Sequence, residues 1–332
     1  MTTPVQPETQ GWRRWARRWT PTGPFDGLVR LILAIPLGLA LMALSGIGHR
    51  GFDLVAQFTA PALVVTAGLT ALLALTRLKA AALHGVIACL TLAIAVSPQW
   101  FPGGPRPEPG APVVRLYSAN LYHLNDDVAA MRRSIEAADA DIVVLVELGL
   151  KAAWRADELL EGYPYRAASM RLGGTRGPSR SVIGSRWPLT ALPDPPDGLH
   201  AVAAVARSPL GRLNVLGVHL TRPWPFQEQW GQISQTMALQ AVVGDLEGPV
   251  VVAGDFNSVS SARIGKQVRR DLGLHPAPGF PGTWPADLPA PLGVTIDQVY
   301  ASPDLAFVQR RLGDPAGSDH RPVVTEITRA AD

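Results

Sequence analysis

The sequence contains a single cysteine, Cys89, and none after it. A zinc site built from thiolates needs several cysteines, and a cysteine-dependent phosphatase needs one as its nucleophile. Both kinds of site are therefore disfavoured beyond residue 89. A cysteine-free domain also folds independently of redox conditions, which suits an exported domain. Cys89 lies in an apolar segment and is interpreted as a small packing residue.

The C-terminal part of the chain also lacks an excess of positive charge. The whole chain has 30 basic and 27 acidic residues, a net charge of +3. Residues 1–111 hold nine of the basic and four of the acidic residues, which leaves 21 basic and 23 acidic residues for the rest. A non-specific DNA-binding protein needs a broadly basic surface, so the balance disfavours that class. One cationic cluster has helical spacing and is interpreted as a solvated face: Arg263, Lys266, Arg269 and Arg270.

Three long apolar segments precede residue 98. Residues 28–47 contain one charged side chain, Arg30, near their start, and residues 58–76 and 80–96 contain none. Helices of this length are about 30 Å long, enough to cross the hydrocarbon core of a bilayer. The segments lack the polar face that helices of soluble proteins show. We therefore expect three transmembrane helices within residues 28–97.

Basic residues around these segments predict their orientation. The segment 1–27 carries Arg13, Arg14, Arg17 and Arg18, and the turn between the second and third segments carries Arg77 and Lys79. The positive-inside rule places both in the cytoplasm. Three spans then leave the rest of the chain outside, as expected for a multi-pass protein of the cytoplasmic (inner) cell membrane. A cleavable signal peptide is the alternative for the first segment, but two further apolar segments favour an anchor.

A segment rich in proline and glycine separates the apolar region from the remainder. Residues 98–111 cannot sustain a helix or a central strand and are interpreted as a semi-rigid linker. Residues 112–332 are numerous enough for one large hydrophobic core. Helices are expected near residues 127–138, 152–160, 227–243 and 262–272, and a proline-rich loop at 279–291 is expected at the rim of a site.

Polar residues follow several short apolar runs in this C-terminal region. Four runs rich in valine and leucine end at Asn120, Glu147, His219 and Asp255. Such runs are typical of strands buried on both faces. Polar residues at the same end of neighbouring strands converge at one edge of a sheet, where functional sites form. A carboxylate such as Glu147 after five apolar residues is costly to bury without a metal or hydrogen-bond partner.

Two later motifs add the remaining chemistry. Asn257 follows Asp255 by two positions, and Asp297 precedes an Asp319–His320 pair that leads into an apolar strand. Hydrolysis of a phosphate ester needs a group that activates water, donors for the phosphoryl oxygens and carboxylates for a divalent metal. Oxygen ligands suit Mg²⁺ or Mn²⁺ better than zinc. The motifs together predict a metal-dependent phosphoric ester hydrolase.

In this order, the motifs resemble those of the endonuclease/exonuclease/phosphatase superfamily, which includes DNase I-like nucleases, apurinic endonucleases, neutral sphingomyelinases and inositol phosphatases. The resemblance covers roughly residues 112–329. It implies an α/β fold, a four-layer α/β/β/α sandwich in which two mixed sheets lie face to face between helices. It also implies a Mg²⁺ or Mn²⁺ cofactor.

Carried over position by position, the resemblance implies a role for each residue. The metal-binding residues would be Asn120, Glu147 and Asp319. Asp255 would orient or deprotonate the attacking water, and Asn257 would contact the phosphate.

The remaining roles concern the histidines. His219 would contact the phosphate or protonate the leaving group, and Asp297 would hydrogen-bond the catalytic His320. Whether Asp255 or His320 activates the water stays open.

Two departures from the family pattern are Val146, where many members have glutamine, and the segment around Arg180, which lacks a usual glycine. Arg180 is interpreted as a surface arginine and left out of the site.

Three functions compete. The first is a membrane-anchored phosphoesterase acting on a lipid-linked phosphate or diphosphate, similar to the branch with glycopeptide-resistance-associated phosphatases thought to act on polyprenyl diphosphates. Tethering would concentrate such an enzyme at its substrate. The second is an extracytoplasmic endonuclease or exonuclease, and the third is a non-catalytic domain that binds a phosphorylated ligand. Four aromatic residues are candidates for lipid contact: Trp224, Phe226, Trp230 and Trp284.

Overall fold

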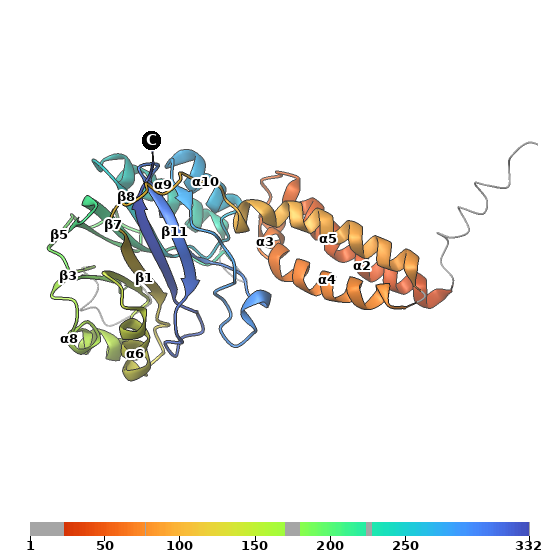
Figure 1. Ribbon diagram of the computed structural model, residues 1–332, viewed down its shortest axis with the longest axis horizontal. Helices are drawn as coiled ribbons and strands as arrows, with labels where there is room; N and C mark the ends of the chain where they lie inside the picture. The colour runs from red at the N-terminus through yellow and green to blue at the C-terminus, as the bar shows by residue number, and fades with distance from the viewer. Residues whose placement is uncertain (1–22, 77, 170–179, 224–227, 332) are drawn as a thin grey trace, which may run out of the picture.

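The computed structural model describes residues 23–76, 78–169, 180–223 and 228–331. A bundle of N-terminal helices projects from an α/β domain (Figure 1). Among the described residues, the bundle contains four helices: α2 (Pro24–Leu44), α3 (Arg50–Ala56), α4 (Thr59–Ala74) and α5 (Lys79–Trp100). α2 and α4 both pack against α5. In its second turn, α5 approaches α4 closely: a Cβ on Gly85 would lie 2.2 Å from Oγ1 of Thr70.

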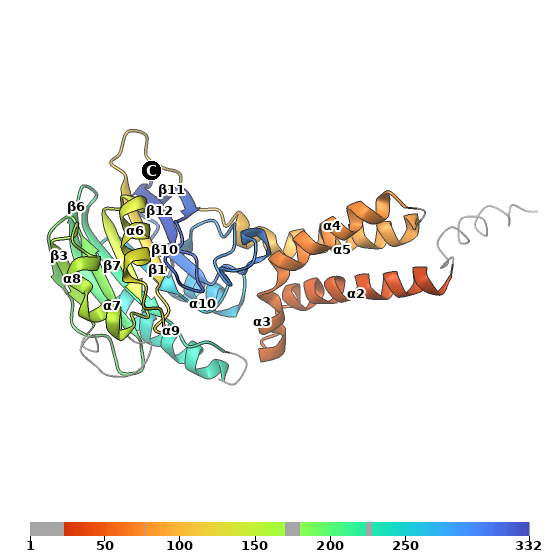
Figure 2. The ribbon, with the colours of Figure 1, turned by 90° about the horizontal axis from the view of Figure 1, so that it is seen from below.

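The predicted number of three transmembrane helices needs correction. α2 and α5 are long and apolar enough to cross a membrane. The middle segment is divided into α3 and α4, which are bent by 54° at their break, and it forms a third span only if the two count as one (Figure 2). The break has a physical reason, because Pro61 lies in the first turn of α4. Its ring and missing N–H prevent a regular helix from continuing back through Gln57.

The linker begins later than predicted, because α5 continues through Pro98 to Trp100. The far end of the linker then lies along the last strand of the domain. The backbone N–H of Glu108 donates to the carbonyl of Arg329 at 2.9 Å, and Pro107 forms an isolated β-bridge with Ala330. The linker is therefore held against the domain at its C-terminal end.

Two six-stranded sheets form the centre of the α/β domain. The order in the first sheet is β11-β12-β1-β2-β4-β3, and in the second it is β5-β6-β7-β8-β10-β9. The strands of the first sheet are β1 (Val114–Asn120), β2 (Ile142–Val146), β3 (Tyr165–Ala168), β4 (Val182–Ser185), β11 (Leu305–Leu312) and β12 (Val323–Arg329). Those of the second are β5 (Leu189–Ala191), β6 (Ala201–Ser208), β7 (Gly211–His219), β8 (Val250–Asp255), β9 (His275–Pro276) and β10 (Asp297–Ala301).

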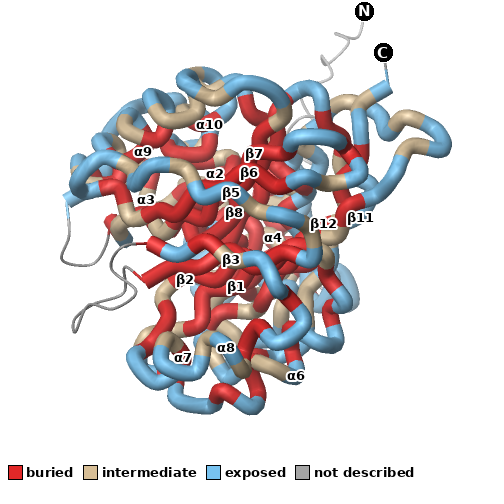
Figure 3. The backbone as a smooth tube through the Cα atoms, turned by 90° about the vertical axis from the view of Figure 1, so that its left-hand side faces the viewer, coloured by how far each residue is buried: buried red, intermediate tan, exposed pale blue. Residues whose placement is uncertain are grey.

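Helices cover the outer face of each sheet, which completes the predicted four-layer sandwich (Figure 3). The first sheet carries α6 (Val128–Ala138), α7 (Leu150–Trp154) and α8 (Ala156–Leu159), and the second carries α9 (Gln229–Gly244) and α10 (Arg263–Asp271). The helix predicted over residues 152–160 is thus two short helices, whereas the other three predicted helices lie within two residues of their expected ends.

The core between the sheets is made of small and branched apolar side chains from both. Packing is close enough that a Cβ on Gly217 of β7 would lie 2.7 Å from Val144 of β2. Glycine at this position therefore lets the two sheets approach, and the sheet edges that carry the polar residues meet at one end of the sandwich.

Candidate active site

In the first sheet, strand register brings three of the predicted residues to one end. β1 and β2 are parallel, and Asn120 at the end of β1 lies beside Val146 at the end of β2. Glu147, the residue after Val146, therefore lies at the same end of the sheet as Asn120. β12 runs antiparallel to β1, with Val323 opposite Ser118. The loop that carries His320 just before β12 therefore reaches the same end of the sheet.

The second sheet places its polar residues in a row. His219 at the end of β7 pairs with Asp255 at the end of β8, and Asp255 pairs with Asp297 at the start of β10. Gly254 permits this arrangement: its φ is +138°, and a Cβ there would lie 2.0 Å from the carbonyl oxygen of Val218. Only glycine tolerates both conditions.

Asn120 joins the two sheet edges. Its Nδ2 donates to Oε2 of Glu147 at 2.6 Å and to Oδ2 of Asp255 at 3.0 Å. Glu147 and Asn257 have positive φ values of 58° and 48°. A side chain in this left-handed region costs roughly 1–2 kcal/mol, and such strain is concentrated at functional sites.

Asp255 is held by a second amide as well. Its Oδ1 accepts from the backbone N–H of Asn257 at 2.7 Å, and its Oδ2 accepts from Nδ2 of Asn257 at 3.1 Å. The same Nδ2 donates to the carbonyl of Leu220 at 2.9 Å. Both amide hydrogens of Asn257 thus have acceptors, and in this arrangement the side chain orients Asp255.

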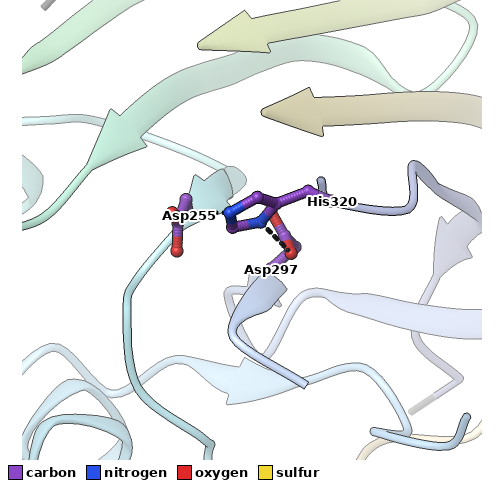
Figure 4. A group of neighbouring side chains, drawn as sticks. All are labelled: Asp255, Asp297 and His320. Atoms are coloured by element: carbon purple, nitrogen blue, oxygen red, sulfur yellow. Dashed lines mark hydrogen bonds and ion pairs between the residues drawn. The ribbon is translucent and has the colours of Figure 1, made fainter. Parts of the chain in front are cut away.

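His320, Asp297 and Asp255 lie next to one another in the interior of the site (Figure 4). Nδ1 of His320 is 2.9 Å from Oδ2 of Asp297, and Nε2 is 3.9 Å from Oδ2 of Asp255. Asp297 therefore fixes the ring so that Nε2 faces Asp255. Ligand atoms of the three residues all lie within 4.8 Å of one another, a spacing that could also hold a metal ion.

The charges of this group follow from burial and from the neighbouring carboxylates. Burial alone would lower the pKa of His320, but Asp297 and Asp255 outweigh it and raise the pKa to about 10. Burial raises the pKa of Asp255, the charge of His320 opposes this, and Asp297 raises it further, to about 6. Near pH 8, His320 is a cationic donor and Asp255 a carboxylate that can accept a proton.

A pH titration tests this charge assignment. Because the pKa of His320 is raised from its ordinary 6.5 to about 10, the bound proton stabilises the folded state. This stability is complete below pH 6.5 and is lost as the pH rises through about 10. In metal-free protein labelled with ¹⁵N-histidine, we expect the His320 ring to stay protonated at pH 8. In the Asp297→Asn variant it should titrate at lower pH, and titration of the wild-type ring near pH 6.5 would contradict the assignment.

The predicted residues surround a cavity of about 500 Å³, which we call the cleft. Six of them line it: Glu147, His219, Asp255, Asn257, Asp319 and His320. Asn120 lies behind Glu147 and Asp255, and Asp297 lies behind His320. Of the three residues expected to bind the metal, Asn120 and Glu147 are in direct contact with each other. The third, Asp319, lines the cleft with an exposed side chain, and its Oδ2 accepts from Nε1 of Trp284 at 3.3 Å.

The structure adds residues that the motifs did not indicate. Nδ1 of His123 is 2.7 Å from Oε1 of Glu147, and Tyr122, His200 and Arg222 also line the cleft. His123 stands three residues after Asn120, just beyond β1, so the same strand-end pattern could have identified it. The interpretation of Arg180 as a surface residue was wrong: it is 3% exposed and donates to the carbonyl of Leu148 at 3.2 Å.

The donor set suits a divalent cation. Within the described part of the chain, three carboxylates of the site form ion pairs with histidine rings. Glu147 pairs with His123 and His219, Asp255 with His219 and His320, and Asp297 with His320. The two carboxylates that converge on the amide of Asn120, Glu147 and Asp255, carry negative charge that a cation would offset, and oxygen donors favour Mg²⁺ or Mn²⁺. Such an ion, when bound, polarises a phosphoryl oxygen and stabilises the charge that develops during displacement.

Comparisons with known proteins agree with this geometry. The model of the endonuclease/exonuclease/phosphatase family matches residues 117–320. No match is found among curated proteins.

Solved structures share the fold. An endonuclease/exonuclease/phosphatase from Bacteroides vulgatus has a TM-score of 0.53 and 17% identity, over 66% of this chain and 99% of that one. One from Beutenbergia cavernae has a TM-score of 0.50 and 20% identity, over 66% and 72%. The catalytic domain of human Nocturnin, solved with a bound sulfate anion, has a TM-score of 0.50 and 18% identity, over 70% and 100%. The chain therefore belongs to the endonuclease/exonuclease/phosphatase family, whose members are metal-dependent phosphoric ester hydrolases.

Proposed function

We propose that this protein is a membrane-anchored, divalent-metal-dependent phosphoesterase that hydrolyses a lipid-linked phosphate or diphosphate outside the cytoplasm. One observation carries the proposal: a loop that forms part of the cleft wall also packs against the apolar helix bundle. This loop runs over residues 277–296 and is called the bridging loop here. It contains the short 3₁₀ helix η2 (Ala290–Leu292), which packs against α4.

Contacts at both ends of the bridging loop support this position. At the bundle, the N–H of Gly279 donates to the carbonyl of Gln99 at 2.8 Å, and the rings of Trp100 and Phe280 lie 4.8 Å apart. At the cleft, the N–H of Ala286 donates to the carbonyl of Asp319 at 2.8 Å. The cleft therefore lies close to the end of the bundle, where the surface of a bilayer around the helices would be.

The opposite wall of the cleft also approaches the bundle. Arg222 lines the cleft, and the carbonyl of the next residue, Pro223, accepts from Nη2 of Arg50 in α3 at 3.4 Å. Trp230 at the start of α9 is 64% exposed, and Phe280 is 44% exposed. Exposed aromatic side chains are typical of the membrane–water interface. Of the other candidates for lipid contact, Trp284 lines the cleft, while Trp224 and Phe226 lie outside the described residues.

The proposed roles of the site residues follow from the charges. Asn120, Glu147 and Asp319 would hold the metal ion. Asp255, ionised above about pH 6, would orient the attacking water and accept its proton. His320, kept cationic by Asp297, would donate from Nε2 to a phosphoryl oxygen, and His219 would face the leaving group. Asn257 would hold Asp255 in place, and a contact from its Nδ2 to the phosphate would require one of its present hydrogen bonds to open.

Surface-dilution kinetics test the substrate class. Full-length protein in mixed micelles with Mg²⁺ is given polyprenyl diphosphate at constant bulk concentration while inert detergent is added. We expect the rate to fall with the mole fraction of substrate in the micelle, because the anchored cleft samples only the micelle surface. A soluble phosphodiester should show no such fall, and the His320→Ala variant controls for contaminating hydrolases.

Two further arms complete the test. Single- and double-stranded DNA should be cleaved at least about tenfold more slowly than the lipid substrate, because the domain carries no net positive charge. In right-side-out spheroplasts, soluble substrate added outside should be hydrolysed without lysis. A preference for DNA would support an extracytoplasmic nuclease, and activity that appears only after lysis would reverse the proposed orientation.

A further inference from the structure

A second cavity of about 390 Å³ lies between the helix bundle and the α/β domain. Residues from the end of α2, the following turn and α3 form one side, and residues from α9 and α10 form the other. α3, α9 and α10 gather at the junction of the two parts (Figure 2). None of the residues that line this cavity lines the cleft. We call it the junction cavity.

Buried contacts hold the walls of the junction cavity together. Oδ1 of Asp53 in α3 accepts from the backbone N–H of Arg263, the first residue of α10, at 2.6 Å, and its Oδ2 accepts from the side chain of Gln229. Asp53 and Gln229 are both buried. Nη1 of Arg263 also donates to the carbonyl of Gly48 at 3.2 Å. The cavity is thus built by contacts between the two parts of the chain.

The two sides of the cavity differ in chemistry. The bundle side is apolar, with Met42, Ala43, Ile47 and Phe52. The domain side carries three cations at the spacing of one helix face: Arg263, Lys266 and Arg270. This face, which the sequence indicated as solvated, is indeed exposed, but the fold turns it toward the end of the apolar helix α2.

The acidic residues of the lining are already engaged. Asp53 accepts the two hydrogen bonds described above, and Asp271 is paired with Nε of Arg270 at 2.7 Å. Within the described part of the chain, Lys266 forms no salt bridge. With three cationic and two acidic side chains, the lining keeps a net charge of +1 beside an apolar wall.

We propose that the junction cavity binds the headgroup of an anionic phospholipid, from the leaflet that surrounds the C-terminal end of α2. The site lies where the apolar helix ends at Leu44, which is the headgroup level if α2 spans the bilayer. Cations at this level attract anionic headgroups, and the apolar wall accommodates the glycerol and the start of the acyl chains. The proposal rests on the anchoring of the helices and not on the identity of the substrate.

The test uses full-length protein in detergent, titrated with phosphatidylglycerol or with phosphatidylcholine of the same acyl chains, and bound lipid is counted by native mass spectrometry. We expect phosphatidylglycerol to bind more tightly to the wild type. Removing two cations in Lys266→Gln/Arg270→Gln should weaken its binding by roughly 25-fold, since each basic residue near a membrane surface contributes about fivefold.

A matched variant separates the site from a general charge effect. Lys151→Gln/Arg212→Gln removes the same charges at exposed positions outside the junction cavity and should bind lipid like the wild type. Glycerol phosphate, which has the headgroup phosphate without acyl chains, should not compete at equal concentration. Equal loss in both double variants, or no preference for phosphatidylglycerol in the wild type, would overturn the proposal. Hydrolysis of a soluble phosphodiester should be unchanged in all three proteins, so failure here would leave the proposed function standing.

Discussion

Replacing His320 by glutamine should lower kcat by about 10³-fold, the usual loss when a positioned acid–base group or a charge-stabilising donor is removed. His320 is the strongest candidate for such an effect because it is buried and lines the cleft, and because its Nδ1 is hydrogen-bonded to Oδ2 of Asp297 at 2.9 Å. Glutamine keeps a polar group beside Asp297 but cannot carry the positive charge. Steady-state hydrolysis of a soluble phosphodiester in Mg²⁺ gives the measurement.

A second histidine provides the control for folding. His275 in β9 is partly buried and its Nε2 lies 3.0 Å from the carbonyl of Leu305, but it does not line the cleft. His275→Gln also removes a partly buried ring, but kcat should stay near the wild-type value, and the melting temperature of each variant shows whether it is folded. Near wild-type turnover in His320→Gln would remove this residue from the mechanism.

The Glu147→Gln variant should need at least about tenfold more Mg²⁺ for half-maximal activity. Even the loss of a residue that only hydrogen-bonds a metal ligand commonly lowers metal affinity by about tenfold or more. The change removes one negative charge from a site where Glu147 contacts Asn120 at 2.6 Å and His123 at 2.7 Å. Direct Mn²⁺ binding by calorimetry should weaken in parallel, which separates a metal ligand from a residue that acts only on turnover.

Glu326→Gln is the matched control for this charge. Glu326 lies in β12, pairs with Arg115 at 3.0 Å and does not line the cleft. Its replacement should leave the Mg²⁺ requirement unchanged, whereas chelation of divalent metal should abolish activity in the wild type and in both variants. If Glu147→Gln shows wild-type metal dependence, the proposed ligand set is wrong.

The local sequence pattern was sufficient to predict a residue's position wherever that position depends only on the strand that carries the residue. Asn120, Glu147, His219 and Asp255 each follow an apolar run, and period and composition alone place them at strand ends. The helices near α6, α9 and α10 were also predicted within two residues of their ends, although four of the five buried residues of α9 are polar: Gln229, Gln232, Gln235 and Thr236. Arg180 was misjudged because burial of a polar residue depends on an acceptor elsewhere in the chain, here the carbonyl of Leu148.

The order of polar residues along the chain, and so the family and the four-layer fold, was already determined by the sequence. Tertiary structure alone decided which of them meet: the register that sets Asp297 opposite Asp255, and the amide of Asn120 that joins the two sheets. It also decided that the bridging loop lies on the bundle and that the cations of α10 face the end of α2. The physical reason is that these contacts join residues far apart in the chain, and their geometry follows from the packing of whole layers, which no local pattern of side chains encodes.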